Sequence, residues 1–231
     1  MITWMSGGEP GIAFQRSDGP LVLGGEARGA AAALAEALAD EHPALDAVTG
    51  PLASCETFAA SWQALTGRVA SHRAHMRNHR LAGLVKPRGV PGVMRKAAPD
   101  DAEWLLATLR AFAVEAELPV NQVALQRQMH ERLDAGGYRL WEVANERVAL
   151  VGFGYAGERA ARIAPVYTVP AFRGHRYASA LVAATCVEIQ RACDAIYLVT
   201  DVTDPVPNAV YRRLGFEALD ETHVFDLVDH R

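Results

Sequence analysis

A basic turn containing Gly174 lies where an extended segment passes into a helical one. It carries the side chains of Arg173, His175 and Arg176. The first four backbone N–H groups of a helix have no partner within the helix, and the helix dipole places partial positive charge at the same end. Such a junction binds phosphate groups without a metal ion, and basic side chains add charged donors. The sequence therefore predicts a pyrophosphate-binding turn here.

The extended segment before this turn is unusual, because Pro165 and Pro170 bracket residues 166–169. Proline cannot donate to a strand ladder, so a strand of this kind splays from its neighbour or bulges. The freed backbone groups suit an extended ligand that contains amides and adds to the strand edge. A pyrophosphate joined to a chain with two amides describes coenzyme A.

These residues resemble the acetyl-CoA signature of the GNAT superfamily of N-acetyltransferases: Arg or Gln, two residues, Gly, one residue, then Gly or Ala. Arg173 and Ala178 match the two ends, whereas Arg176 occupies the position of the inner glycine. Glycine permits a positive φ and a close approach to phosphates, while arginine supplies a phosphate donor instead. The resemblance implies acetyl-CoA as co-substrate, bound by Val166, Tyr167, Thr168, Arg173, Gly174, His175, Arg176, Tyr177, Ala178, Ser179 and Asn208.

A second block, residues 197–216, is similar to the next strand and helix of the same family. Asn208 and Tyr211 are three residues apart, so they share one face of a short helix that Gly215 ends. The resemblance implies that Asn208 contacts the cofactor and that Tyr211 lies beside the thioester sulfur, where it would protonate the leaving thiolate. Without that context, a tyrosine here is a partly buried packing residue.

The attacking amine must lose its proton, and residues 161–169 contain no carboxylate that could accept it. The candidate bases are therefore Asp201 and Glu142, reached through water, or a backbone carbonyl. The expected reaction is direct transfer of acetyl from acetyl-CoA to a primary amine of a small molecule or peptide. Two alternatives stay open: a non-catalytic acyl-CoA-binding regulatory module, and an acetyltransferase of protein N-termini or lysines.

The composition is compatible with this expectation. The chain has 231 residues, half of them apolar, and a net charge of -4, which argues against nucleic acid as the main partner. It shows no leader pattern and no apolar run long enough to cross a bilayer, so a cytoplasmic protein without a membrane partner is expected. The three cysteines, Cys55, Cys186 and Cys193, are expected to be buried thiols. A homodimer stays open.

Proline and glycine residues mark a linker at residues 87–92. The division that follows is a partial GNAT-like domain over residues 1–86 and a complete GNAT domain over residues 93–231. The expected fold class is α/β (α+β), the GNAT acyltransferase fold, with a mixed central sheet, a splayed strand pair and flanking helices. Helices are expected from Asp100, as N-cap with Glu103 in the capping-box position, and over residues 122–133 and 179–192. Strands are expected over residues 93–97, 138–143, 147–155, 160–169, 196–202 and 217–227, with a turn at Asn145 that joins the second of them to the third.

The segment before the linker is predicted to contain helices over residues 26–40 and 57–65 and a strand over residues 68–81. This pattern is similar to the degenerate first half of two-domain GNAT members, of which mycothiol synthase is one. An appended layer without a ligand is the alternative.

Two other patterns are assigned no ligand. Gly152, Gly154 and Gly157 form Gly-x-Gly-x-x-Gly, but the next strand follows too soon for the crossover helix of a dinucleotide site. In a strand, His72 would point away from His75 and His79, and the arginines among them would repel a cation. No metal site is therefore predicted, and these histidines are expected on a solvated or interdomain face.

Overall fold

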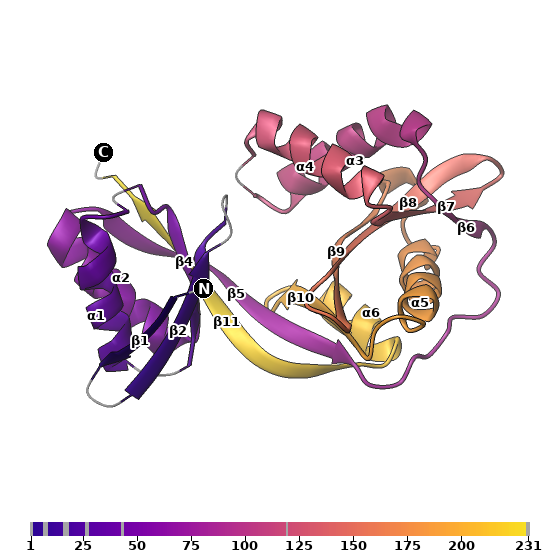
Figure 1. The fold of residues 1–231 in the computed structure, drawn as a ribbon. Coiled ribbons are helices and arrows are strands. Elements are labelled where there is room, and N and C mark those ends of the chain that lie inside the picture. Colours follow the sequence, from indigo (N-terminus) through magenta and orange to yellow (C-terminus); the bar gives the residue numbers. More distant parts are fainter. Residues whose placement is uncertain are drawn as a thin grey trace. The chain divides into compact units, whose positions relative to one another are not determined.

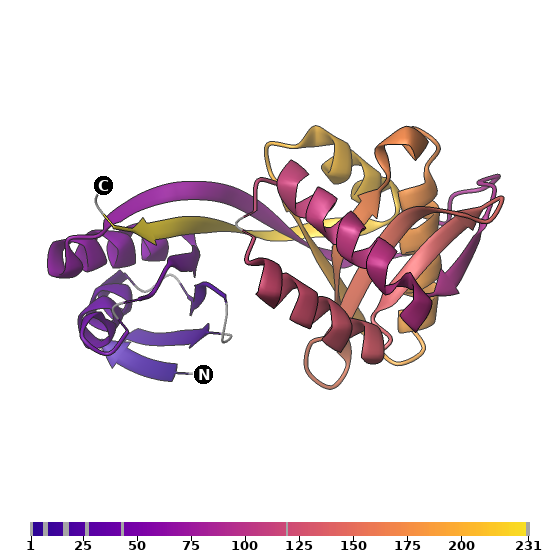
Figure 2. The ribbon, with the colours of Figure 1, turned by 90° about the horizontal axis from the view of Figure 1, so that it is seen from above.

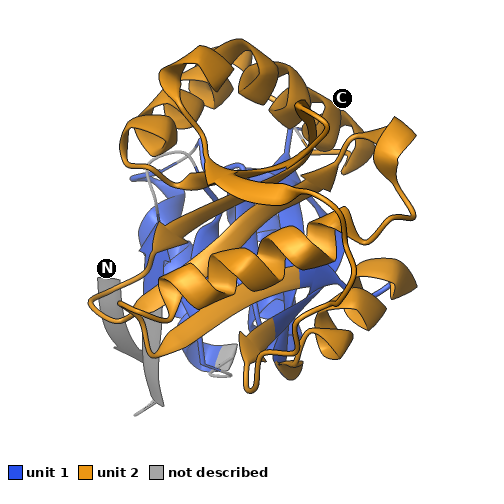
Figure 3. Cartoon of the chain, turned by 90° about the vertical axis from the view of Figure 1, so that its right-hand side faces the viewer, with its two compact units in different colours: residues 1–78, 200–204, 219–231 blue, residues 79–199, 205–218 orange. Residues whose placement is uncertain are grey.

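The computed structural model describes residues 2–6, 9–15, 19–25, 28–42, 44–118 and 120–229. The chain forms two compact units (Figure 3), the first made of Met1–Asn78, Thr200–Asp204 and Leu219–Arg231, and the second of His79–Val199 and Pro205–Ala218. The units are not consecutive halves, because two later segments return to the first. The expected linker at residues 87–92 lies within the second unit, so the domain division at that linker stays a prediction.

The second unit has helices on both faces of a mixed sheet (Figure 1). Its strands are β6 (Val93–Lys96), β7 (Tyr138–Val143), β8 (Glu146–Tyr155) and β9 (Ala160–Thr168), with parts of β5 (Val69–Leu81), β10 (Ala195–Asp201) and β11 (Phe216–Val228). Its helices are α3 (Ala102–Glu115), α4 (Gln122–Asp134), α5 (Tyr177–Ile189) and α6 (Pro205–Arg213), with 3-10 turns η1 (Pro99–Asp101) and η2 (Pro170–Phe172). The strand order is β11-β5-β10-β9-β8-β7-β6, which agrees with the predicted α/β class.

Strand β8 is buried on both faces, as a strand between two layers of helices must be. Leu150 belongs to the apolar cluster that α3 and α4 form with the sheet, and it packs there with Leu105 and Met129. Its neighbour Val151 belongs to the cluster that contains Leu181 of α5. Successive side chains of one strand therefore join the two layers.

Local signals place several of these elements. The Asn121 side chain accepts hydrogen bonds from the backbone N–H groups of Val123 and Ala124 at the start of α4, which confirms the predicted helix there. The predicted turn between β7 and β8 is also confirmed, with Asn145 at φ 66. Helix α5 begins at Tyr177, earlier than the expected residue 179.

The first unit contains an antiparallel run of strands followed by two helices. Its elements are β1 (Ile2–Ser6), β2 (Glu9–Gln15), β3 (Leu21–Gly24), α1 (Arg28–Ala39), β4 (Ala47–Gly50) and α2 (Leu52–Thr66). The strand order is β1-β2-β3-β4-β11-β5, with β3 and β4 parallel. The predictions of α1 and β5 are confirmed, α2 begins earlier than expected, and the sequence did not reveal β1 to β4.

Strand β11 belongs to both units, which the sequence did not indicate. It is one strand of 13 residues, and its later part pairs antiparallel with β4, from His223 opposite Gly50 to Asp226 opposite Ala47. Leu227 has 0% of its surface exposed and lies in the apolar cluster of the first unit. Figures 1 and 2 both show β5 and β11 side by side, in agreement with the strand order.

The histidines of β5 are arranged differently from the prediction. His72 Nε2 lies 3.0 Å from His223 Nδ1, while the His75 ring stacks on the same imidazole with centroids 4.1 Å apart. The expectation that His72 points away from His75 is therefore wrong, because both meet His223 of β11. His75 Nε2 also lies 2.6 Å from Glu221 Oε2, and Arg77 donates to the other oxygen of Glu221.

In the part of the chain that the structure describes, no group of three or more His, Cys, Asp or Glu side chains is arranged to hold a metal ion. None of the helices in the same residues combines the length and the apolar character needed to cross a membrane. The three cysteines are buried and free, as expected.

We expect Leu227→Ala to destabilise the first unit by about 2–5 kcal/mol, because it opens a cavity in that unit's core. Urea denaturation, combined with hydrogen exchange of the α1 and α2 amides, measures the loss. Val228→Ala is the matched control, since Val228 is exposed and should change stability by less than about 0.5 kcal/mol. Equal stability of the two variants would contradict the placement of β11.

Candidate active site

Strands β9 and β10 separate after a short parallel pairing. The pairing covers Ala160 to Arg162 of β9 and Ala195 to Tyr197 of β10. Within the described residues, the rest of β9 has no partner in β10, while it keeps its antiparallel partner β8 as far as Thr168. The predicted splay is therefore present, and one edge of β9 carries backbone groups that the sheet does not use.

The other edge of β9 is distorted opposite Gly152. The register with β8 shifts between Val151 and Phe153. A Cβ atom on Gly152 would lie 2.7 Å from the carbonyl oxygen of Ala164 and 2.8 Å from Pro165 Cδ, so only glycine fits. The close approach of β9 therefore accounts for this glycine of the Gly-x-Gly-x-x-Gly pattern.

The chain passes from β9 through η2 into a turn with two left-handed residues. Gly174 has φ 81, and Arg176, the N-cap of α5, has φ 62. Among the described residues, no side chain caps α5. The first-turn amides of Tyr177, Ala178 and Ser179 therefore have no side-chain acceptor and are suited to an anion.

Arg176 adopts the conformation that glycine would adopt in its place. An L-residue in the left-handed region is disfavoured by about 1–2 kcal/mol. Its Nη2 donates to the carbonyl oxygen of Arg88 at 3.2 Å. The His175 ring stacks on Tyr177 with centroids 5.4 Å apart, so both basic side chains stay beside the turn.

Arg173 makes contacts that sequence reasoning missed. Its Nη2 donates to Glu115 Oε2 at 2.6 Å, and its Nε donates to the carbonyl oxygen of Thr168 at 3.1 Å. The Tyr167 hydroxyl donates to the other oxygen of Glu115 at 2.5 Å. Glu115 ends α3 and lies 52 residues from Tyr167 in the chain, so no local pattern could have indicated the contact.

These hydrogen bonds fix the charge of the cluster formed by Glu115, Tyr167 and Arg173. The Tyr167 hydroxyl, followed by Arg173, lowers the pKa of Glu115. Burial, followed by the hydrogen bond to Glu115, raises the pKa of Tyr167. Glu115 therefore stays ionised and Tyr167 protonated, so the cluster ties the end of β9 to the end of α3.

Tyr211 lies in the core between α5 and β11. It is 9% exposed and meets Phe216 edge to face, with centroids 5.8 Å apart. Burial raises the pKa of its phenol far above the ordinary value, with a further contribution from Cys186. The hydroxyl therefore stays protonated at neutral pH, and burial makes it a weaker acid than an exposed phenol. Asn208 lies one turn earlier on α6.

The two candidate bases occupy separate places. Asp201, the last residue of β10, accepts hydrogen bonds at Oδ1 from the Thr203 amide at 2.7 Å and the Thr203 hydroxyl at 2.6 Å. Glu142 lies on β7, which β8 separates from β9. Its Oε1 is 2.8 Å from Arg95 Nη2, so this carboxylate already has a cationic partner.

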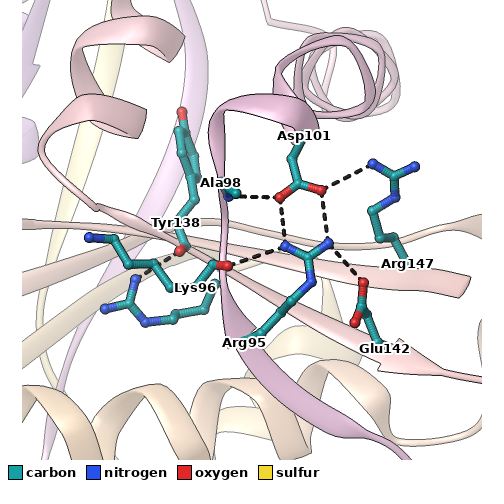
Figure 4. A network of polar contacts seen from close by, with 8 residues as sticks. Arg95, Lys96, Ala98, Asp101, Tyr138, Glu142 and Arg147 are labelled. Carbon is teal, nitrogen blue, oxygen red and sulfur yellow. Dashed lines mark hydrogen bonds and ion pairs between the residues drawn. The ribbon is translucent and has the colours of Figure 1, made fainter. Parts of the chain in front are cut away.

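Asp101 joins Arg95 and Arg147 in the network that contains Glu142 (Figure 4). Its side chain is 5% exposed and accepts from Arg95 Nη1 at 2.6 Å, from the Ala98 amide at 2.7 Å and from Arg147 Nη1 at 3.1 Å. The hydrogen bond from Arg95 is the main cause that lowers the pKa of Asp101 to about 2.

The expectation that Asp100 is the N-cap is therefore wrong. Helix α3 begins at Ala102 with Asp101 as its N-cap, and Asp100 is exposed. The buried carboxylate is the one that faces the two arginines.

Comparison with known proteins agrees with this architecture. Residues 103–216 match the family described as Acetyltransferase (GNAT) family. A search of curated proteins finds no match. Residues 103–216, which contain the splayed strand and the basic turn, therefore form a domain of the GNAT acetyltransferase family.

Several solved structures share the fold. A Drosophila protein has a TM-score of 0.69 at 13% identity, over 95% of this chain and 74% of that one. A GNAT-family acetyltransferase from Colwellia psychrerythraea has a TM-score of 0.59 at 12% identity, over 98% and 84%. A tandem GNAT protein from the clavulanic acid biosynthesis pathway has a TM-score of 0.54 at 17% identity, over 98% and 82%. At these identities the likeness concerns the fold.

We expect Asp101→Asn to lower the free energy of unfolding at pH 7 by about 2 kcal/mol, since the pKa of Asp101 is lowered from 3.8 to about 2. A lowered folded-state pKa stabilises the protein above the unfolded pKa, and this contribution is lost as the pH falls through the folded value. The difference between wild type and variant should therefore shrink below about pH 4. Thermal melts across this range measure it. Asp100→Asn is the control, and an equal loss in both variants would contradict the assignment.

A pair of substitutions at Arg176 separates its charge from its backbone conformation. We expect Arg176→Gly to be more stable than Arg176→Ala by about 0.5–1 kcal/mol, because glycine removes the left-handed penalty but adds freedom to the unfolded chain. Chemical denaturation measures the difference. At Arg212, an exposed helical position, the order should reverse, with glycine about 1 kcal/mol less stable than alanine. The same order at both positions would contradict the left-handed conformation.

Proposed function

We propose that this protein transfers an acetyl group from acetyl-CoA to a primary amine of a small molecule or a peptide by direct attack. The observation that carries the proposal is the splay of β9 from β10 beside the uncapped N-terminus of α5. A single chain segment thus provides a free strand edge for the amides of the cofactor and an anion-binding turn for its pyrophosphate.

In this proposal the cofactor's amides pair with Val166 to Thr168, and its phosphates bind residues 174–179, with Asn208 as a further contact. Arg173 supports the turn through Glu115, and it would turn toward the phosphates only by giving up that ion pair. Only one cofactor would bind per chain. The corresponding junction of the first unit, between β3 and α1, contains Glu26 and no basic residue before Arg28, and the carbonyl oxygen of Gly25 accepts from Ser54.

The chemical step requires a neutral amine. A lysine-like amine has a pKa of ~10.4, so keeping it neutral near pH 7 costs ~4–5 kcal/mol. Its nitrogen attacks the thioester carbonyl, and backbone N–H groups of β9 stabilise the oxyanion. As the C–S bond breaks, the thiolate takes a proton from Tyr211. Water carries the amine's proton to Asp201, the candidate at the end of a strand that borders the splay, or to Glu142.

We also propose that the first unit is a reduced GNAT-like half. Its sequence of elements, β1-β2-β3-α1-β4-α2-β5, repeats in the second unit as β7-β8-β9-α5-β10-α6-β11. Three antiparallel strands come first in each series, and the strand after the first helix lies parallel to the third strand. The likeness to a tandem GNAT protein supports this reading.

Binding of acetyl-CoA is the first test. A ligand that binds only the folded state stabilises it by ~2.7 kcal/mol at 100 times its dissociation constant. We expect millimolar acetyl-CoA to raise the melting temperature, and Arg173→Ala to reduce that rise. Arg159→Ala, which removes an exposed ion pair with Asp194, is the control. A melting temperature that does not respond to acetyl-CoA or CoA would argue against the proposed function.

Turnover in Tyr211→Phe tests the proton donor. The phenylalanine ring keeps the contact with Phe216, whereas the proton is lost, so we expect the rate to fall ~100 to 10,000-fold with little change in acetyl-CoA affinity. The assay uses isotope-labelled acetyl-CoA and a panel of amines. Tyr155→Phe, at an exposed position, should leave the rate unchanged. An unchanged rate in Tyr211→Phe would exclude this role, whereas acetyl-CoA binding without any turnover would favour the regulatory module.

A further inference from the structure

A hollow lies in the second unit, on the face of α5 that is turned toward β6 and β7. Its volume is about 550 Å³, which is within the range of small-molecule sites. The lining comes from α5 between Ala180 and Glu188, from Arg191 just after this helix, from the segment before β6, and from Met94 and Trp141. None of the residues proposed to bind acetyl-CoA belongs to this lining.

The hollow exists because the first two turns of this face of α5 carry small side chains, before Val187 and Glu188 complete the face. Ala180, Ala183 and Ala184 follow the three- and four-residue spacing of a single helix face. Opposite them, the Trp141 indole is held in place, since its Nε1 donates to the carbonyl oxygen of Pro91 at 2.9 Å. Protein interiors are normally filled. Here the methyl groups of α5 and a fixed indole leave an open apolar space instead.

The charges around this space favour an anion. Lys86 and Arg191 belong to the lining, and among the described residues neither side chain makes a hydrogen bond or an ion pair. The one carboxylate in the lining, Glu188, is paired through both oxygens with Arg139, and the hydrogen bonds of Arg139 lower the pKa of Glu188. The charge of Arg191 also lowers the pKa of Glu188, although the two side chains form no direct ion pair. Lys86 and Arg191 thus place two positive charges beside an apolar floor.

We propose that this hollow binds a small amphipathic carboxylate, such as a medium-chain fatty acid. Its apolar chain would lie against Met94, Trp141 and the alanine face of α5, and its carboxylate would meet Lys86 and Arg191. An apolar body is recognised by burial and a carboxylate by charge-assisted hydrogen bonds. The inference does not depend on the acetyltransferase activity, because it rests on a different set of residues.

Titration calorimetry with octanoate tests the site. We expect saturable binding of one octanoate per chain, no binding of octylamine, and at least tenfold weaker binding of octanol, which lacks the charge. Saturating CoA should leave octanoate binding unchanged, because the two sites share no residue. Competition between CoA and octanoate would overturn the location, and equal binding of octylamine would overturn the charge argument.

Two kinds of substitution locate the ligand. Ala184→Leu fills the hollow and should weaken octanoate binding at least tenfold, whereas Ala192→Leu, at an exposed position outside the lining, should not. Arg191→Gln with Lys86→Gln should weaken octanoate but not octanol, and Arg159→Gln is the charge control. The double glutamine variant keeps the test decisive if Ala184→Leu does not fold. An octanoate affinity that is unchanged both in Ala184→Leu and in the double glutamine variant would overturn the proposal. A second outcome would also overturn it: the wild type is a dimer, Ala184→Leu dissociates that dimer, and octanoate does not bind. This outcome would assign the hollow to a second copy of this chain.

Discussion

The loss of pairing between β9 and β10 is the constraint on which the second unit depends. Backbone polar groups inside a protein require partners, so a strand cannot leave its neighbour without compensation. On one side, β9 keeps β8 by a distorted register that Gly152 makes sterically feasible. On the other side, the unused groups lie beside the turn that begins α5. A free strand edge and an uncapped helix N-terminus therefore lie next to each other. The candidate site consists of the backbone groups of β9 and α5 that have no hydrogen-bond partner within the sheet or the helix.

Helix α3 is fixed to the sheet at both ends by charge. At its start, Asp101 binds Arg95 of β6 and Arg147 of β8. At its end, Glu115 binds Tyr167 of β9 and Arg173 of the basic turn. Apolar packing alone holds a helix against a sheet without fixing its axial position. These two charged clusters fix the axial position of α3, and they align this helix with the end of the splayed strand.

Sequence patterns predicted the features that depend on near neighbours. The hairpin turn at Asn145, the start of α4 at Gln122, the splay before Pro170 and the glycine-containing turn all follow from local residue chemistry. The choice of Asp101 over the adjacent Asp100 was not predictable in this way, since burial between two arginines decides it. The contact of Glu115 with the turn, and the pairing of β11 with β4, join distant parts of the chain and have no local signal.

The return of β11 to the first unit has a consequence for biosynthesis. Domains usually fold as the ribosome releases them, N-terminal ones first. Here the core of the first unit lacks Leu227, and β4 lacks its antiparallel partner, until β11 has been synthesised. The first unit thus waits for the whole of the second to be translated. A chain that terminates before β11 would therefore leave one edge of β4 unpaired, and an unpaired strand edge can pair with another chain.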